Sequence, residues 1–245
     1  MGRPTSRPLV RIAHAYGNNR HALTHALHAD IDMIEADMWY RRGDLRIHHE
    51  QRIGRLPLLA DRRMPAHRAP RFALPFGKYF VRPDIGTIGL DELLRTVNGR
   101  KRLLLDVKGH YKQPHLDGYV ETLVRKIREH KAESWATVCG QTYSVLHRLR
   151  EVAPDLEVRY SVEQPYQWER FQSLMEQGVR RACMSFRFLD EAKARVMGEA
   201  GVDVFFWTVD EGATARSLVD RGAGGIISND LTLLAGLPRV TPSSG

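Results

Sequence analysis

Cysteine is scarce in this sequence, and long apolar runs are missing from it. Only Cys139 and Cys183 occur in 245 residues. Small secreted domains that depend on disulfides carry more cysteines, so we expect both to be buried free thiols. No stretch approaches the roughly 20 apolar residues of a membrane span, and the first ten residues lack the apolar run of a signal peptide. We therefore expect a soluble, cytoplasmic protein.

Basic residues outnumber acidic ones, with 37 lysines and arginines against 29 aspartates and glutamates. The most basic segment runs from residue 41 to residue 71 and contains nine arginines. A basic surface raises the local concentration of phosphate-bearing ligands, which leaves an anionic membrane surface open as a partner. Binding to nucleic acid would rest on charge alone, so we expect no specific nucleic-acid partner.

Apolar segments rich in valine, isoleucine and phenylalanine alternate with segments of helical period, which is typical of βαβ units around a parallel sheet. The eight expected strands are Leu9–His14, Met33–Tyr40, Arg102–Lys108, Ala136–Gly140, Glu157–Glu163, Arg181–Phe186, Asp203–Val209 and Gly224–Ser228. Helices are expected near 19–29, 90–98, 116–130, 142–151, 166–177, 190–200 and 211–221, with a short one after Asp230. The pattern predicts an α/β fold, a single (β/α)8 TIM barrel over about residues 9–238, in one domain of residues 1–245 with short flexible termini.

An insertion is expected after the second strand. Residues 41–44 form a turn signal, and Leu45 to Glu50 then alternates as a short strand that folds back in a hairpin. Residues 51–89 have no clean period and contain several prolines. A loop of this length in a compact domain is usually functional or disordered. Its place after a strand puts it at the carboxyl end of the barrel, where active sites of this fold lie.

Carboxylates are expected to converge at that end of the barrel. Glu35 and Asp37 are two residues apart in one strand and therefore share a face. Asp106 stands near the end of the next barrel strand, with Lys108 two residues further on. A single strand carboxylate is more often a cap or an ion-pair partner, but the repeated spacing favours a hard oxygen site for Mg²⁺ or Ca²⁺. Lys108 could then hold a phosphate oxygen.

Two histidines end strands near this site. His14 ends the first strand, and His49 ends the hairpin strand on its apolar face, which favours it over His48. Two imidazoles beside a metal-bound phosphodiester can serve as general base and general acid. The three histidines between residues 21 and 28 are spaced as a solvated helix face instead.

Aromatic residues supply two further candidates for substrate contact. Trp207 stands at the carboxyl end of an expected strand and is a candidate substrate platform, although such a residue is a core aromatic in most proteins. The apolar run from Phe72 to Phe80 is a candidate lid that touches lipid, although packing over the barrel is its commoner fate.

Together these motifs resemble the glycerophosphodiester phosphodiesterase family over nearly the whole chain. The matching segments are Ile12-Ala13-His14, Glu35-Ala36-Asp37, His49-Glu50, Asp106-Val107-Lys108, Trp207-Thr208-Val209 and Gly225-Ile226-Ile227. In that family two histidines act as acid and base, and three carboxylates bind the metal. The resemblance implies the acid and base roles for His14 and His49, and metal binding for Glu35, Asp37 and Asp106. It also implies hydrolysis of a glycerophosphodiester to an alcohol and glycerol phosphate.

The chain departs from that family at several positions. Ala15 stands where the family usually has an arginine that helps hold phosphate, and the usual Pro-Glu-Asn-Thr stretch is replaced by residues 18–21. Glu50 and Asp106 exchange the acid type of the family pattern. The missing arginine and the Asp-x-Lys motif resemble the related sphingomyelinase D and phospholipase D toxin branch. That branch has an asparagine shortly after its first histidine, so Asn18 is a candidate substrate-binding residue.

Two alternatives to the glycerophosphodiesterase hypothesis remain. One is a phospholipase D-type enzyme that acts on a lysophospholipid or sphingolipid and releases a cyclic phosphate. The other is a barrel that binds a phosphorylated ligand without turnover, since fold alone does not establish function. Retention of all the core site residues argues against the second alternative.

Overall fold

The computed structural model of the chain describes residues 8–48, 51–53, 56–59, 74–76, 79–81 and 88–238. Its barrel strands are β1 (Val10–Ala13), β2 (Met33–Arg41), β9 (Arg102–Val107), β10 (Ala136–Gly140), β11 (Glu157–Val162), β12 (Arg181–Ser185), β13 (Asp203–Trp207) and β14 (Gly225–Ser228). Neighbouring barrel strands are parallel, and β1 pairs with both β2 and β14, which closes the sheet. The predicted (β/α)8 barrel is confirmed, with every expected strand in place.

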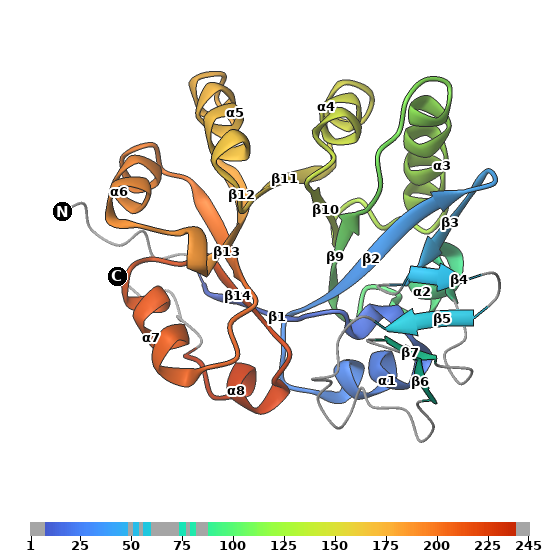
Figure 1. Cartoon of the computed structure of the whole chain (residues 1–245), viewed down its shortest axis with the longest axis horizontal. Helices are drawn as coiled ribbons and strands as arrows, with labels where there is room; N and C mark the ends of the chain where they lie inside the picture. The colour runs from blue at the N-terminus through green and yellow to red at the C-terminus, as the bar shows by residue number, and fades with distance from the viewer. Residues whose placement is uncertain are drawn as a thin grey trace.

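Helices surround the barrel on the outside (Figure 1). They are α1 (Arg20–His28), α2 (Leu90–Val97), α3 (His115–Glu129), α4 (Tyr143–Val152), α5 (Pro165–Glu176), α6 (Glu191–Glu199), α7 (Gly212–Asp220) and α8 (Leu231–Ala235), with 3-10 turns η1 (Tyr16–Asn18) and η2 (Phe186–Phe188). In α2 the buried residues Leu90, Leu93, Leu94 and Val97 follow helical spacing, so one face packs on the sheet. Each helix lies within two residues of its expected bounds. In the described part of the chain, no helix has the length and apolar character needed to span a membrane.

The core has two layers, one between the strands and the helices and one inside the barrel. The inner layer consists of Ile12, Met33, Leu104, Cys139, Cys183, Phe205 and Ile227. Both cysteines are buried and free, as expected. At the amino end of the strands, the Arg159 guanidinium lies 3.4 Å from the centroid of the Phe205 ring and 2.6 Å from the Asp203 carboxylate. This arrangement fills the amino end of the barrel and leaves its carboxyl end for a pocket.

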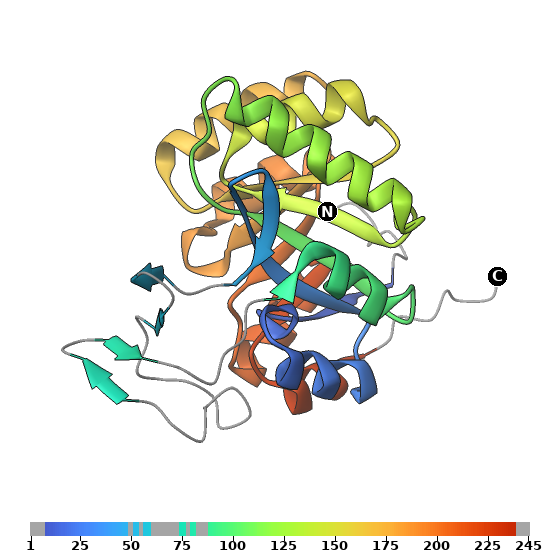
Figure 2. The same cartoon turned by 90° about the vertical axis from the view of Figure 1, so that its right-hand side faces the viewer.

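The insertion begins with the predicted hairpin, because β3 (Asp44–Ile47) pairs antiparallel with β2. The chain returns through β8 (Ile88–Gly89), which pairs antiparallel with β3. Between them, β4 (Gln51–Ile53), β5 (Leu56–Leu59), β6 (Leu74–Phe76) and β7 (Tyr79–Val81) form a separate antiparallel sheet beside the barrel (Figure 2). The sequence did not predict this sheet, because strands of three or four residues are too short to show a period.

A buried lysine on α3 fastens the hairpin to the helix layer. Lys126 is 7% exposed, and its ammonium lies 3.4 Å from the Asp44 carboxylate of β3. It also forms an ion pair with Asp91 of α2, which His130 contacts at 3.3 Å. Because a buried ammonium needs partners, Lys126 holds the two segments that flank the insertion in fixed positions.

Candidate active site

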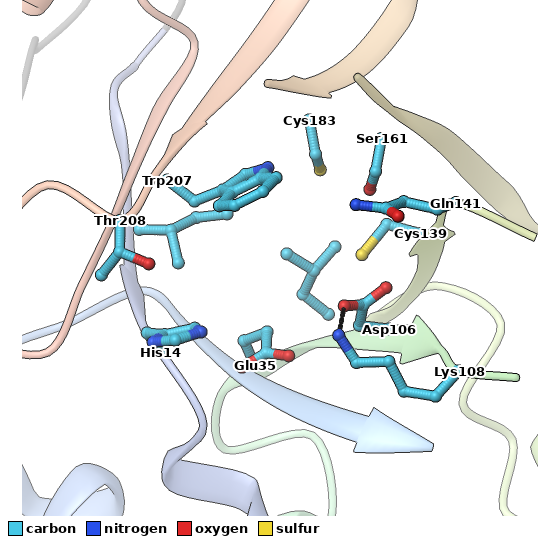
Figure 3. Close-up of a pocket in the computed structure, with 12 residues that line it drawn as sticks. His14, Glu35, Asp106, Lys108, Cys139, Gln141, Ser161, Cys183, Trp207 and Thr208 are labelled. Atoms are coloured by element: carbon cyan, nitrogen blue, oxygen red, sulfur yellow. Dashed lines mark hydrogen bonds and ion pairs between the residues drawn. The ribbon is translucent and has the colours of Figure 1, made fainter. Parts of the chain in front are cut away.

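A pocket of about 290 Å³ opens at the carboxyl end of the barrel (Figure 3). Its lining residues include His14, Glu35, Asp106, Lys108 and Trp207, all of which the sequence predicts as site residues. His14, Glu35 and Lys108 lie along one side of the pocket, and Trp207 and Cys183 lie across from them. Residues far apart in the chain therefore meet where this fold places active sites.

The three predicted carboxylates converge as expected. Glu35 and Asp37 share a face of β2, and the register of β2 with β9 sets Asp37 beside Asp106. One oxygen from each of the three carboxylates lies within 4.8 Å of the others. Burial, followed by the charges of Asp37 and Asp106, raises the pKa of Glu35 well above its usual range. Buried carboxylates that repel one another in this way fit a divalent cation, which supplies the charge they lack.

Lys108 adds a positive charge to this cluster. Its Nζ lies 2.9 Å from Oδ1 of Asp37 and also forms an ion pair with Asp106. Burial disfavours the ammonium, but Asp37, Asp106 and Glu35 together raise the pKa of Lys108 above its usual value. The lysine is therefore charged at neutral pH, and its ammonium stands at the pocket wall beside the carboxylates.

The turn after β1 holds Glu35 from behind. Ala15 has a left-handed backbone with φ of 58°, and this conformation lets its N–H donate to the Glu35 carboxylate. Gly17 follows, and a Cβ there would lie 2.5 Å from the Cβ of Ala36, so only glycine permits this approach of η1 to β2.

Asn18 holds Asp37 through two hydrogen bonds. Its Oδ1 accepts the backbone N–H of Asp37 at 2.8 Å, and its Nδ2 donates to the Asp37 carboxylate at 2.6 Å. Asn18 is 3% exposed and lies behind Asp37 instead of among the residues that line the pocket. The contacts that the structure describes give this side chain a part in orienting Asp37, while its predicted contact with substrate stays a prediction.

His14 is held by a chain of hydrogen bonds that the sequence did not reveal. Its Nδ1 lies 2.9 Å from Oδ1 of Asn229, and Nδ2 of Asn229 donates to the Asp210 carboxylate at 2.7 Å. The backbone N–H of Asn229 and the hydroxyl of Ser228 donate to the same carboxylate, at 2.7 Å and 2.9 Å. Burial alone would raise the pKa of Asp210, but the hydrogen bonds from Asn229 and Ser228 outweigh it and lower this pKa. Asp210 and Asn229 follow the ends of β13 and β14, and this position at strand ends was the available signal.

This chain of contacts defines the tautomer of His14. A carboxylate can only accept, so Asp210 must face the NH₂ group of Asn229, and the amide oxygen must face His14. Nδ1 of His14 therefore carries a proton, and in the neutral ring Nε2 carries the lone pair. A neutral His14 is thus prepared to accept a proton through Nε2.

The remaining lining of the pocket is less polar. Its lining includes Cys139, Cys183, Leu104 and Ile227, with Gln141, Ser161 and Thr208 as the polar members. Burial raises the pKa of Cys139 well above its usual range, so this thiol stays protonated at neutral pH. A protonated thiol is a poor nucleophile, which excludes Cys139 as the group that attacks phosphorus.

The second predicted catalytic histidine, His49, lies outside the described residues. Its neighbour His48 is described, and the His48 N–H donates to the backbone oxygen of Asp37 at 3.0 Å. The Trp39 indole stacks on the His48 ring and donates to its carbonyl at 2.9 Å. The chain therefore reaches residue 48 directly beside the carboxylate cluster. The histidines at 21, 25 and 28 lie exposed on α1, as expected.

No family model and no curated protein matches the sequence. Solved structures do match the fold. A provisionally named glycerophosphoryl diester phosphodiesterase from Silicibacter pomeroyi matches with a TM-score of 0.74 at 19% identity, over 95% of this chain and 93% of that chain. The glycerophosphodiester phosphodiesterase from Thermotoga maritima matches with a TM-score of 0.67 at 14% identity, over 94% of this chain and 98% of that chain.

A third match carries a ligand. It is a phosphodiesterase from Oleispira antarctica in complex with the product sn-glycerol-3-phosphate, with a TM-score of 0.66 at 15% identity, over 93% of this chain and 95% of that chain. This chain has the fold of the glycerophosphodiester phosphodiesterases. Sequence identities this low establish the fold, and the activity of this chain has to be argued from its own site.

Proposed function

We propose that this protein is a metal-dependent phosphodiesterase that hydrolyses glycerophosphodiesters to an alcohol and glycerol phosphate. The observation that carries this proposal is that Glu35, Asp106, His14 and Lys108 line one pocket, with Asp37 buried in the same carboxylate cluster. The set combines a cation site, a base and a fixed positive charge, which are the groups that cleavage of a phosphodiester requires.

Glu35, Asp37 and Asp106 would hold one divalent cation, Mg²⁺ or Ca²⁺, because all three offer hard oxygen atoms. When bound, such an ion polarises a phosphoryl oxygen and offsets negative charge. Asn18 and the N–H of Ala15 orient two of these carboxylates before any ion arrives. Hydrogen bonds to the residues that bind a metal fix the orientation and the basicity of those residues.

His14 would act as one of the two acid and base groups. Its Nδ1 proton is held by Asn229, so Nε2 can take a proton from a water molecule or a substrate hydroxyl that attacks phosphorus. We assign the complementary acid role to His49, which follows the strand that ends beside Asp37. The ammonium of Lys108 would hold a phosphate oxygen as a point charge.

The substrate is proposed to be a small or lipid-linked phosphodiester. The Oleispira antarctica structure holds sn-glycerol-3-phosphate, and a pocket of about 290 Å³ is large enough for a ligand of that size. Trp207 lines the pocket opposite Lys108 and would present its ring to the alcohol or glycerol part. Asn18 would assist substrate binding indirectly, through its hydrogen bonds to Asp37.

Phosphorus NMR of glycerophosphocholine and lysophosphatidylcholine tests the proposal. Each substrate is incubated with Mg²⁺, Ca²⁺ or a chelator, and with wild type, His14→Ala, and His21→Ala as a matched control on the exposed face of α1. We expect metal-dependent turnover that His14→Ala abolishes and His21→Ala leaves unchanged. Absence of metal-dependent turnover across a wide diester panel, with metal binding retained, would refute the enzyme and favour a ligand-binding barrel.

A phospholipase D-type reaction on a lysophospholipid or sphingolipid is the second candidate. It is favoured by Ala15, which is 6% exposed, uses its backbone N–H to bind Glu35 and offers no side chain for phosphate. Choline release from lysophosphatidylcholine but not from glycerophosphocholine, with a cyclic phosphate in the phosphorus spectrum, would select this reaction over the first.

A further inference from the structure

A second pocket lies on the outer wall of the barrel, between α4 and α5. Figure 1 shows these helices on either side of β11. The pocket has a volume of about 360 Å³. It is lined by Arg150, Pro154, Leu156, Val158, Tyr160, Gly178, Val179, Arg180 and Arg181. Most of these residues lie near the amino ends of β11 and β12, whereas the candidate active site lies at the carboxyl end of the strands.

The charge of this pocket has one sign. Arg150, Arg180 and Arg181 line it, and no acidic residue does so in the described part of the chain. The nearest partner of Arg181 is Glu157, whose carboxylate lies 3.7 Å away. That carboxylate also binds the Arg159 guanidinium at 2.8 Å, so its charge is shared. The pocket therefore keeps a net positive charge.

Two arginines are already oriented for binding. Nη1 of Arg180 donates to the backbone oxygens of Met175 and Val179 at 2.5 Å and 2.9 Å, which positions the guanidinium at the end of α5. Arg150 lies beside the Tyr160 hydroxyl, where its charge lowers a tyrosine pKa that burial raises. An oriented guanidinium loses less conformational freedom when it forms hydrogen bonds to an anion.

The arginine charges also affect the pKa of a nearby histidine. His147 of α4 lies 3.3 Å from the Tyr160 hydroxyl. Burial, followed by the charges of Arg170 and Arg150, lowers the pKa of His147. Burial disfavours charge of either sign, so only the arginine contribution bears on an anion, and it shows that the positive charge of Arg150 extends to His147.

A smaller part of the pocket lining is apolar. Leu156, Val158 and Val179 are each less than 10% exposed, and they form a wall beside the arginines together with Pro154. A free inorganic anion would leave this wall unused, whereas a ligand with an apolar ring or chain would cover it. We infer that the α4–α5 pocket binds a small organic phosphate, with its phosphate on the arginines and its apolar part on this wall.

The test uses phenyl phosphate as the probe, with inorganic phosphate for comparison, in the presence of a chelator. Backbone amide shifts are followed by NMR in the full-length protein. Arg150→Gln removes one binding group, and Arg125→Gln is the matched control, because Arg125 is an exposed arginine on α3 outside the pocket. Circular dichroism confirms that both variants stay folded.

We expect saturable shifts at residues 154–160 and 178–181, with phenyl phosphate bound more tightly than inorganic phosphate. Arg150→Gln should weaken binding about tenfold, as expected for a lost charge-assisted contact, and Arg125→Gln should not change it. Equal affinity for the two probes would refute an organic ligand. Shifts confined to residues around His14 and Glu35, or equal loss in both variants, would overturn the site. Binding to anionic vesicles without binding of phenyl phosphate would show a membrane contact in its place.

Discussion

Nδ1 of His14 lies 2.9 Å from the side-chain oxygen of Asn229, whose amide is oriented by the Asp210 carboxylate. The relation joins the end of β1 to the ends of β13 and β14, so three strands set the direction of one imidazole. It explains how a neutral histidine in this pocket keeps its lone pair on Nε2.

Substitution of Asp210 tests whether this chain of contacts positions His14. Asp210→Asn lets the Asn229 amide turn, so His14 loses its preferred tautomer and the proposed turnover number should fall about 10- to 100-fold with little change in KM. The pH profile of kcat should shift as well, because the neighbouring negative charge is gone. The control is Asp220→Asn on the exposed end of α7. An unchanged kcat and pH profile in Asp210→Asn would show that the network serves stability alone.

The raised pKa of Glu35 predicts how stability depends on pH without metal. The folded chain keeps a proton on Glu35 at pH values where the unfolded chain has lost it, so raising the pH above the usual glutamate range lowers the free energy of unfolding. A divalent cation should therefore raise Tm more at pH 8 than at pH 5, since it binds the ionised carboxylates. Thermal unfolding with Mg²⁺, Ca²⁺ and chelator measures this difference. Glu35→Gln should remove most of it, and an equal metal effect at both pH values in wild type would contradict the assignment.

The left-handed backbone at Ala15 predicts that glycine is tolerated at this position and that a β-branched residue is not. Glycine adopts this conformation without strain, so Ala15→Gly should keep stability and metal affinity close to those of wild type. A β-branched side chain fits it poorly, so Ala15→Val should cost about 2 kcal/mol and weaken metal binding, because the N–H that Glu35 accepts is displaced. Urea unfolding and metal titration compare the two variants. Equal behaviour of glycine and valine would show that the backbone at this position is not constrained.

The ion pair between Asp91 and Lys126 predicts a modest loss of stability in acid. Burial alone would raise the pKa of Asp91, but the contacts with Lys126 and His130 outweigh it and lower this pKa. Its contribution is therefore present above the usual aspartate range and is lost as the pH falls through the lower, folded-state pKa. The Asp91 side chain is 39% exposed, so after allowance for solvent screening Asp91→Asn should cost less than about 1 kcal/mol at pH 7. Urea unfolding at pH 7 and pH 3 should show the difference from wild type shrinking at the lower pH, whereas a constant difference would refute the pairing.

Much of the fold follows from patterns that need no tertiary information. The strands of the barrel are short apolar segments and the helices are amphipathic, so both kinds of period are visible in the sequence. The same period of two predicts that Glu35 and Asp37 share a face, and the parallel strand order then brings Asp106 beside them.

The supporting contacts of the site were not predictable in this way. Asp210 and Asn229 act through partners that are distant in the chain, and neither stands in a periodic pattern. Asn18 illustrates the same limit, because the sequence predicts contact with substrate but gives no sign of the hydrogen bonds with Asp37 that the structure shows. Residues that hold other residues become visible only when the strands are assembled.

The insertion after β2 leaves and re-enters the barrel at neighbouring points, because Ile47 of β3 is paired with Ile88 of β8. A segment anchored between two paired residues can be lengthened, shortened or exchanged while the barrel remains closed. The carboxylates proposed to bind the metal belong to the barrel strands and would keep their geometry through such an exchange. A chimera that keeps residues 48–50, and with them the proposed acid His49, and carries another insertion between residues 51 and 87 should therefore fold and keep its metal affinity.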